Sequence, residues 1–175
     1  MRKGGGKAKG ASFEREVCTQ LSLWLSVGAR KDLFWRSAMS GGRATIRQKK
    51  GEKPVSQHGD ISAVDPLGHL LTDHFYIECK NYKDLNLTAF LLKQTGILQQ
   101  FWEKTVLEAQ KYAKKPLLIC RQNMYPTFVL FAKPKYKREQ TQIIPHVCFN
   151  IPKSDCHLML LSDFVEHMPP PLKKE

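Results

Sequence analysis

The chain lacks several features that mark membrane, secreted or disulfide-stabilised proteins. No apolar run comes near the roughly 20 residues of a membrane-spanning helix. Residues 1–10 are rich in glycine and lysine and contain no apolar stretch, so they do not resemble a secretory signal peptide. The five cysteines include no CxxC pair and do not have the spacing of a standard zinc site. We therefore expect a soluble, non-membrane protein with reduced thiols, in the cytoplasm of a prokaryote or of a virus-infected host.

Acidic residues are also scarce, with 16 Asp and Glu against 28 Lys and Arg and a net charge of +12. The positive charge is concentrated in residues 1–10, 30–53 and 133–138, and the rest of the chain is slightly acidic. Charge that serves only solubility usually mixes both signs over the surface. The uneven distribution is typical of a protein that binds a polyanion, and it favours nucleic acid as the partner.

The apolar periodicity predicts an α/β fold in which a mixed central β-sheet is flanked by helices. A helix is expected from Ser12, as its N-cap, to Val27, and a second helical region follows Leu85, is interrupted near Gly96 and ends near Lys115. A short closing helix is expected after Ser162. Strand-like runs lie at residues 33–36, 60–64, 75–80, 117–120, 127–131, 143–149 and 158–161.

The chain length and the absence of an internal boundary predict one domain over residues 11–167. Residues 1–10 are expected to form a basic flexible tail and residues 168–175 a C-terminal tail. Residues 43–57 are basic and poor in apolar side chains, which predicts a mobile loop. The runs at 60–64 and 75–80 are expected to pair as a hairpin or meander.

Two acids and a lysine form the most informative cluster. Asp60 begins one predicted strand, and Glu78-Cys79-Lys80 lies in the next. Side chains alternate between the two faces of a strand, so Tyr76, Glu78 and Lys80 share one face. Carboxylate oxygens are the ligands that Mg²⁺ prefers, and the ion can bridge them to a phosphate.

These motifs resemble the active site of the PD-(D/E)XK nuclease superfamily. Gly59-Asp60 and the strand Ile77-Glu78-Cys79-Lys80-Asn81 match its acidic motifs, and the helix opening over residues 10–16 is similar to the Holliday-junction resolvase-like branch. The resemblance covers about residues 10–131. It implies a restriction-endonuclease-like core and a metal-dependent DNA endonuclease that hydrolyses phosphodiester bonds, most plausibly a Holliday-junction or branched-DNA resolvase.

The resemblance also implies roles for individual residues. Asp60 and Glu78 would bind Mg²⁺, with Mn²⁺ able to substitute, and the backbone carbonyl of Cys79 would be a further metal contact. Glu16 would reach the metal from the N-terminal helix, directly or through water. Lys80 would position the attacking water and neutralise charge on the scissile phosphate.

The basic segments are expected to follow the DNA backbone on either side of the catalytic residues. The predicted nucleic-acid contacts are Arg43, Arg47, Lys49, Lys50, Lys53, Arg121, Lys133, Lys135, Tyr136, Lys137 and Arg138. A resolvase that cuts two symmetric strands would work as a homodimer. The alternatives are a nicking, restriction or repair nuclease of the same fold, and a noncatalytic DNA- or RNA-binding protein.

Overall fold

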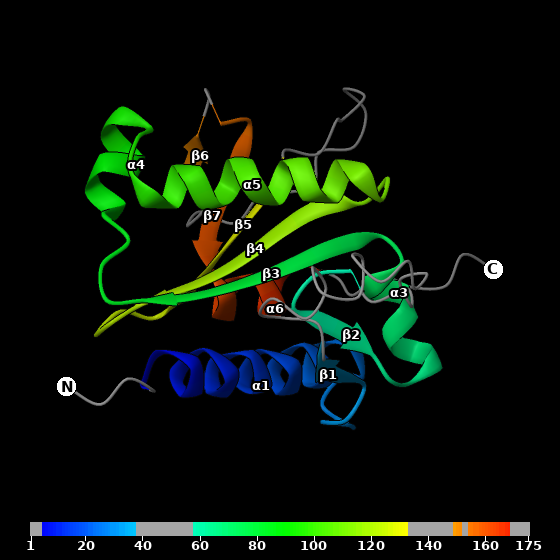
Figure 1. Ribbon diagram of the computed structural model, residues 1–175. Helices are drawn as coiled ribbons and strands as arrows, with labels where there is room; N and C mark the ends of the chain where they lie inside the picture. Colours follow the sequence, from blue (N-terminus) through cyan, green and yellow to red (C-terminus); the bar gives the residue numbers. More distant parts are fainter. Residues whose placement is uncertain (1–4, 38–57, 133–148, 152–153, 169–175) are drawn as a thin grey trace, which may run out of the picture.

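A five-stranded mixed sheet lies between helices on both faces of the computed structural model (Figure 1). The structure describes residues 5–37, 58–132, 149–151 and 154–168. Along the sheet, the strands are β3 (Phe75–Tyr82), β4 (Lys115–Gln122), β5 (Thr127–Ala132), β7 (Cys156–Leu160) and β6 (Phe149–Ile151). Strands β3 and β4 are parallel, and the other pairs are antiparallel. The expected α/β architecture with a restriction-endonuclease-like core is confirmed.

Each face of the sheet has its own apolar core. Helix α1 (Gly5–Leu25) packs below the sheet in Figure 1, where its buried side chains meet the β3 residues Ile77 and Cys79. Helices α4 (Leu87–Lys93) and α5 (Ile97–Lys111) cover the opposite face. The expected break near Gly96 is confirmed: Gln94 and Gly96 both have positive φ angles, of 52° and 95°. None of the helices in the described ranges is long and apolar enough to cross a membrane.

Helix α1 starts at Gly5, so the predicted N-cap at Ser12 is wrong. Residues 5–10 are expected to belong to a tail, because three glycines and two lysines dominate the local sequence. Tertiary contact overrides this weak local propensity. The Lys9 ammonium donates a hydrogen bond to the side-chain carbonyl of Asn123 in the β4–β5 turn, and so attaches the first turns of α1 to the sheet.

The expected hairpin between residues 60–64 and 75–80 is also wrong. Strand β2 (Ile61–Ala63) pairs with β1 (Phe34–Arg36) in a separate antiparallel ribbon. Between β2 and β3 the chain passes through a 3₁₀ turn, η1 (Pro66–Gly68), and the short helix α3 (His69–Thr72). A Cβ atom at Gly68 would lie 2.7 Å from the carbonyl oxygen of Leu33, so a glycine is needed where this turn meets the ribbon.

The C-terminal helix α6 (Leu161–His167) packs against α1 and β5. Its N-cap position is Leu160, so the expectation that Ser162 caps it is wrong. Of the strand expected over 143–149, only Phe149 lies within the described residues, where it begins β6. Cys18, Cys79 and Cys120 are buried free thiols that pack as small core residues, and Cys156 is buried as well.

Candidate active site

Asp60 is fixed against the outer edge of β3 by its backbone and by its side chain. Its N–H donates to the Ile77 carbonyl over 2.8 Å, and its Oδ2 accepts the Cys79 N–H over 2.9 Å. The preceding residue, Gly59, has φ of 92° and forms a parallel bridge with Ile77. A Cβ atom at Gly59 would lie 2.5 Å from the Ile77 oxygen, so only glycine permits this close approach.

The predicted alternation of side chains along β3 is confirmed. Ile77 and Cys79 are buried against α1, whereas Glu78 and Lys80 lie on the other face. The Lys80 ammonium contacts Glu78 Oε1 and lies 3.9 Å from Asp60 Oδ2. The structure thus brings Asp60, Glu78 and Lys80 together, and their side chains are only 13%, 14% and 23% exposed.

The electrostatics of this cluster are those of two acids confined with one cation. Burial, reinforced by the negative charge of Glu78, raises the pKa of Asp60 to about 7. Burial alone would lower the pKa of Lys80, but the charges of Glu78 and Asp60 outweigh it and raise this pKa. Lys80 is therefore a fixed ammonium group at neutral pH. In this form it can neutralise the charge of an anion.

The donor set suits a hard divalent cation that keeps part of its water shell. The described residues contain no group of three or more His, Cys, Asp or Glu side chains arranged to hold a metal. Asp60 and Glu78 offer two adjacent carboxylates whose mutual repulsion a cation would relieve, and Mg²⁺ commonly binds through one or two carboxylates plus waters. The Cys79 carbonyl lies beside them, since it accepts a hydrogen bond from Lys80 Nζ over 3.4 Å. The Cys79 thiol is buried in the α1 core and is not a ligand.

Comparison with protein families agrees with this geometry. A family model described as "Phage putative PDDEXK endonuclease" matches residues 5–170 of the chain. The chain belongs to this phage PDDEXK endonuclease family. Neither a curated protein nor a solved structure matches the chain. The match confirms the resemblance to the PD-(D/E)XK superfamily, while assignment to the Holliday-junction resolvase branch stays a prediction.

In this PDDEXK chain, Glu16 does not join the carboxylate cluster. Its oxygens accept hydrogen bonds from both terminal nitrogens of Arg121, one of them over 2.8 Å. These bonds hold the pKa of Glu16 below its ordinary value. Arg121 also lies 4.9 Å above the ring of Phe13 and donates to Thr127 Oγ1 over 2.9 Å. Arg121, expected to bind phosphate, is therefore held in a network that joins α1 to β4 and β5.

The acid of α1 that lies near the cluster is Glu14. Its negative charge contributes to the raised pKa values of Asp60 and Cys79. Its carboxylate accepts a hydrogen bond from Arg36 Nε of β1 over 2.8 Å, and its side chain is only 13% exposed. The sequence carried a signal for this: Glu14 lies four residues before the buried Cys18, on a sheet-facing side of the helix.

Aromatic rings continue the cluster along the same face of β3. The Tyr76 hydroxyl donates to Glu78 Oε2 over 3.3 Å, and its ring lies parallel to that of Tyr112, with 6.1 Å between centroids. Tyr112 stacks on His58 at 3.7 Å. Sequence reasoning identified the shared face of Tyr76 and Glu78, but it did not identify this hydrogen bond. Tyr112 is brought to the site only by the packing of α5.

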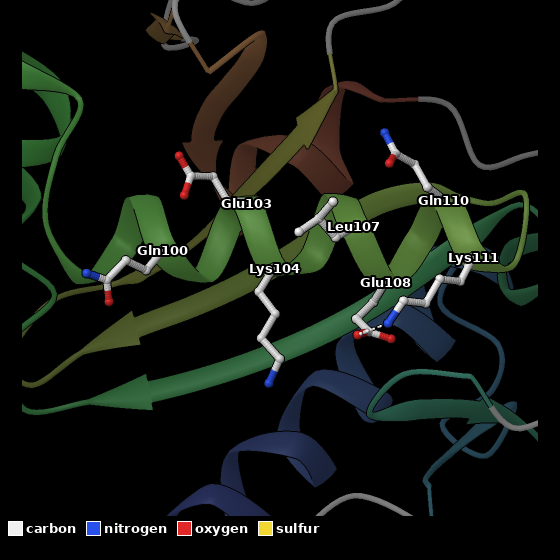
Figure 2. Close-up of a pocket in the computed structure, with 7 residues that line it drawn as sticks. All are labelled: Gln100, Glu103, Lys104, Leu107, Glu108, Gln110 and Lys111. Carbon is white, nitrogen blue, oxygen red and sulfur yellow. Dashed lines mark hydrogen bonds and ion pairs between the residues drawn. The ribbon is translucent and has the colours of Figure 1, made fainter.

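Most of the predicted nucleic-acid contacts cannot be placed relative to this site. The basic residues of 43–53 and all those of 133–138 lie outside the described ranges, so their roles stay predictions. Figure 2 shows a cation in the described part, on α5: Lys104 and Glu108 extend to the β3 side of the helix, whereas Gln110 extends to the other side. These residues belong to an open groove along α5. Asp60, Glu78 and Lys80 are not among the described residues that line it.

Proposed function

We propose that this PDDEXK chain is a metal-dependent DNA endonuclease that hydrolyses phosphodiester bonds. The observation that carries the proposal is the convergence of Asp60, Glu78 and Lys80 at the edge of β3. Asp60 and Glu78 would hold Mg²⁺, or Mn²⁺ in its place, with the Cys79 carbonyl as an additional oxygen. The net charge of +12 supports a polyanionic substrate.

The residues of the chain divide the chemistry between them. The bound cation supplies Lewis-acid stabilisation of the phosphate and lowers the pKa of a coordinated water. Lys80, held as an ammonium group by Glu78 and Asp60, would bind a nonbridging phosphate oxygen and stabilise the charge that develops on it. The backbone bonds of Asp60 to β3 keep its carboxylate in position, so little reorganisation accompanies the reaction.

We assign to Glu14 the role near the metal that the resemblance implies for Glu16. The negative charge of Glu14 on α1 acts on Asp60, and Arg36 restrains the Glu14 carboxylate. Glu14 would act on the metal through a coordinated water. Glu16, in contrast, would stabilise the attachment of α1 to β4 through Arg121.

The finer proposal is a resolvase of Holliday junctions or other branched DNA, acting as a homodimer. Its support is the resemblance of the catalytic motifs and the need for two symmetric cuts at a junction. Nicking, restriction and repair nucleases share the same chemistry, and their substrates distinguish them from a resolvase. Sedimentation of the protein with and without a junction tests the dimer.

One experiment tests the nuclease proposal. Labelled four-way junction, linear duplex, single-stranded DNA and RNA are incubated with the protein in Mg²⁺, in Mn²⁺ or in EDTA. The Glu78→Gln variant should lose cleavage by at least about 100-fold because it removes a charged ligand. Glu103→Gln, which changes an exposed acid of α5, should cleave like the wild type. Binding without metal-dependent cleavage of any substrate would identify a noncatalytic nucleic-acid-binding protein instead.

A further inference from the structure

Three large, exposed side chains come from the tip of the sheet, where β3 ends and β4 turns into β5. We call Tyr82, Met124 and Tyr125 the tip patch; they are 42%, 101% and 52% exposed. The Asn123 N–H donates to the Tyr82 carbonyl over 3.0 Å, so the turn and the end of β3 are held side by side. Large apolar side chains gathered at one place on a surface commonly mark an interaction site.

The turn presents Met124 to solvent at an energetic cost. Met124 has φ of 67°, a left-handed conformation that costs a residue with a side chain roughly 1 kcal/mol or more. The turn is closed by the Tyr125 N–H, which donates to the Gln122 carbonyl over 3.1 Å. Neither the backbone conformation nor the full exposure of Met124 contributes to the core. The turn itself requires the left-handed conformation at this position, so the exposed side chain of Met124 is the feature that is open to a ligand.

The tip patch is continuous with the catalytic cluster. Tyr82 follows Lys80 by two residues, so it lies on the same face of β3 about 7 Å further along the strand. The Phe101 ring connects them, since it lies 5.8 Å from Lys80 Nζ and 5.1 Å from the Tyr82 ring, edge to face. In a single strand of B-form DNA, about 7 Å is the rise of two nucleotides.

Two cations lie beside the tip patch, and positive charge there suits the phosphates of a nucleic acid. Lys9 reaches the turn through its bond to Asn123, and the exposed Lys83 follows Tyr82 in the chain. The acid nearest in sequence, Asp84, accepts the Asn86 backbone N–H over 2.8 Å. Aromatic side chains next to cations are the usual platform for unpaired bases, because each base presents a stacking face and each phosphate a negative charge.

We propose that the tip patch stacks unpaired bases next to the scissile phosphate, so that the preferred substrate is DNA with unpaired nucleotides beside the cut. The inference rests on the proposed nuclease function and names a substrate feature for it. A continuous duplex does not satisfy the patch, because its base faces are stacked on one another. Met124 would enter between adjacent bases, as apolar side chains do in proteins that unstack DNA.

Binding in EDTA tests the proposal without relying on catalysis. Dissociation constants are measured for a continuous duplex and for the same duplex with a short gap of adenines, one replaced by fluorescent 2-aminopurine. The wild type should bind the gapped DNA more tightly and alter the 2-aminopurine emission. Tyr82→Ala with Met124→Ser should weaken gap binding roughly five- to hundredfold, the range of lost stacking. Duplex affinity should stay unchanged. If the double variant does not fold, Tyr125→Ser serves in its place.

Matched controls separate stacking from general loss of apolar surface. Leu107→Ser and Val27→Ser remove exposed apolar side chains of α5 and of the turn after α1, and they should keep the preference for the gap. Tyr82→Phe keeps the aromatic ring and should also keep the preference for the gap. Equal wild-type affinity for both DNAs overturns the proposal. A tip-patch variant that loses a wild-type dimer in sedimentation while keeping the gap preference also overturns it, since the patch is then a contact between copies. Failure of metal-dependent cleavage, with the gap preference intact, contradicts only the nuclease proposal.

Discussion

The Tyr76 hydroxyl donates a hydrogen bond to Glu78 Oε2 over 3.3 Å, while Lys80 contacts the other oxygen of the same carboxylate. Both oxygens of Glu78 are therefore held before any metal binds. Tyr76 is 8% exposed and packs parallel to Tyr112, so its hydroxyl has little freedom to move. The carboxylate is orientated by a buried tyrosine that lies on the same strand face.

This relationship predicts that Tyr76→Phe weakens metal binding while the fold is retained. Loss of a hydrogen bond to a metal-ligating carboxylate should weaken affinity for Mn²⁺ roughly tenfold or more, measured by calorimetry. The expected kinetic effect is a higher metal concentration at half-maximal rate. Tyr82→Phe removes a hydroxyl from the same face of β3 and is the matched control. Equal Mn²⁺ affinity in both variants would show that Tyr76 has only a packing role.

The pKa of Asp60 predicts an unusual pH dependence of stability in the metal-free protein. Its pKa is about 7 when folded, above the ordinary value of 3.8, so the folded state keeps a proton that the unfolded state releases. This contribution to stability is complete below about pH 4 and is lost as the pH rises through 7. Asp60→Asn should therefore raise the free energy of unfolding at pH 8 in EDTA by about 1–3 kcal/mol, which gives a higher Tm. At pH 4 the substitution should change the Tm little.

Added metal should reverse the order of thermal stability, so that the wild type has a higher Tm than Asp60→Asn. The wild type should gain Tm at pH 8 with millimolar Mg²⁺, because a ligand that binds only the folded state stabilises it. The Asn variant should gain little. Scanning calorimetry of both proteins at two pH values, with and without metal, measures all of these shifts. A variant that is less stable than the wild type at pH 8 in EDTA would contradict the electrostatic account.

Substitution of Gly59 tests how Asp60 is positioned. Gly59→Ala should destabilise the protein by about 1–3 kcal/mol and reduce cleavage, because the new Cβ meets the Ile77 backbone at 2.5 Å. Gly28→Ala is the matched control, since Gly28 also has a positive φ, of 84°, but a Cβ there meets no atom within 4 Å. Both variants share the backbone strain. A loss of metal affinity confined to Gly59→Ala would show that the close contact with β3 places Asp60.

Local patterns in the sequence were sufficient to predict the strand that carries Glu78 and Lys80, but not the segments that pack beside it. The alternation over residues 75–80 depends only on strand geometry, and it placed Glu78 and Lys80 on one face correctly. The location of Asp60 depends on the bridge between Gly59 and Ile77, a contact across 18 residues that no local period encodes. The hairpin prediction failed for this reason: β2 pairs with a strand that precedes it by more than 20 residues.

Local sequence also could not predict which acid of α1, Glu14 or Glu16, lies near Asp60. Glu14 and Glu16 are both compatible with an amphipathic helix, and only the packing of α1 under β3 distinguishes them. Arg121 and Arg36 then select different partners: Arg121 binds Glu16, and Arg36 binds Glu14. Two residues of spacing on a helix correspond to roughly 200° of rotation, so the two acids point in nearly opposite directions.

Exchange of each acid for its amide tests that assignment. Glu14→Gln should weaken Mn²⁺ affinity and lower the pKa of Asp60, because it removes a negative charge that acts on that carboxyl. The pH midpoint of metal binding should fall accordingly. Glu16→Gln should leave metal affinity unchanged and lower the Tm through loss of the paired hydrogen bonds from Arg121. Calorimetric titrations of both variants against pH distinguish the roles. If Glu16→Gln alone weakens metal binding, Glu16 reaches the metal as the sequence first suggested, and α1 must rotate when the metal binds.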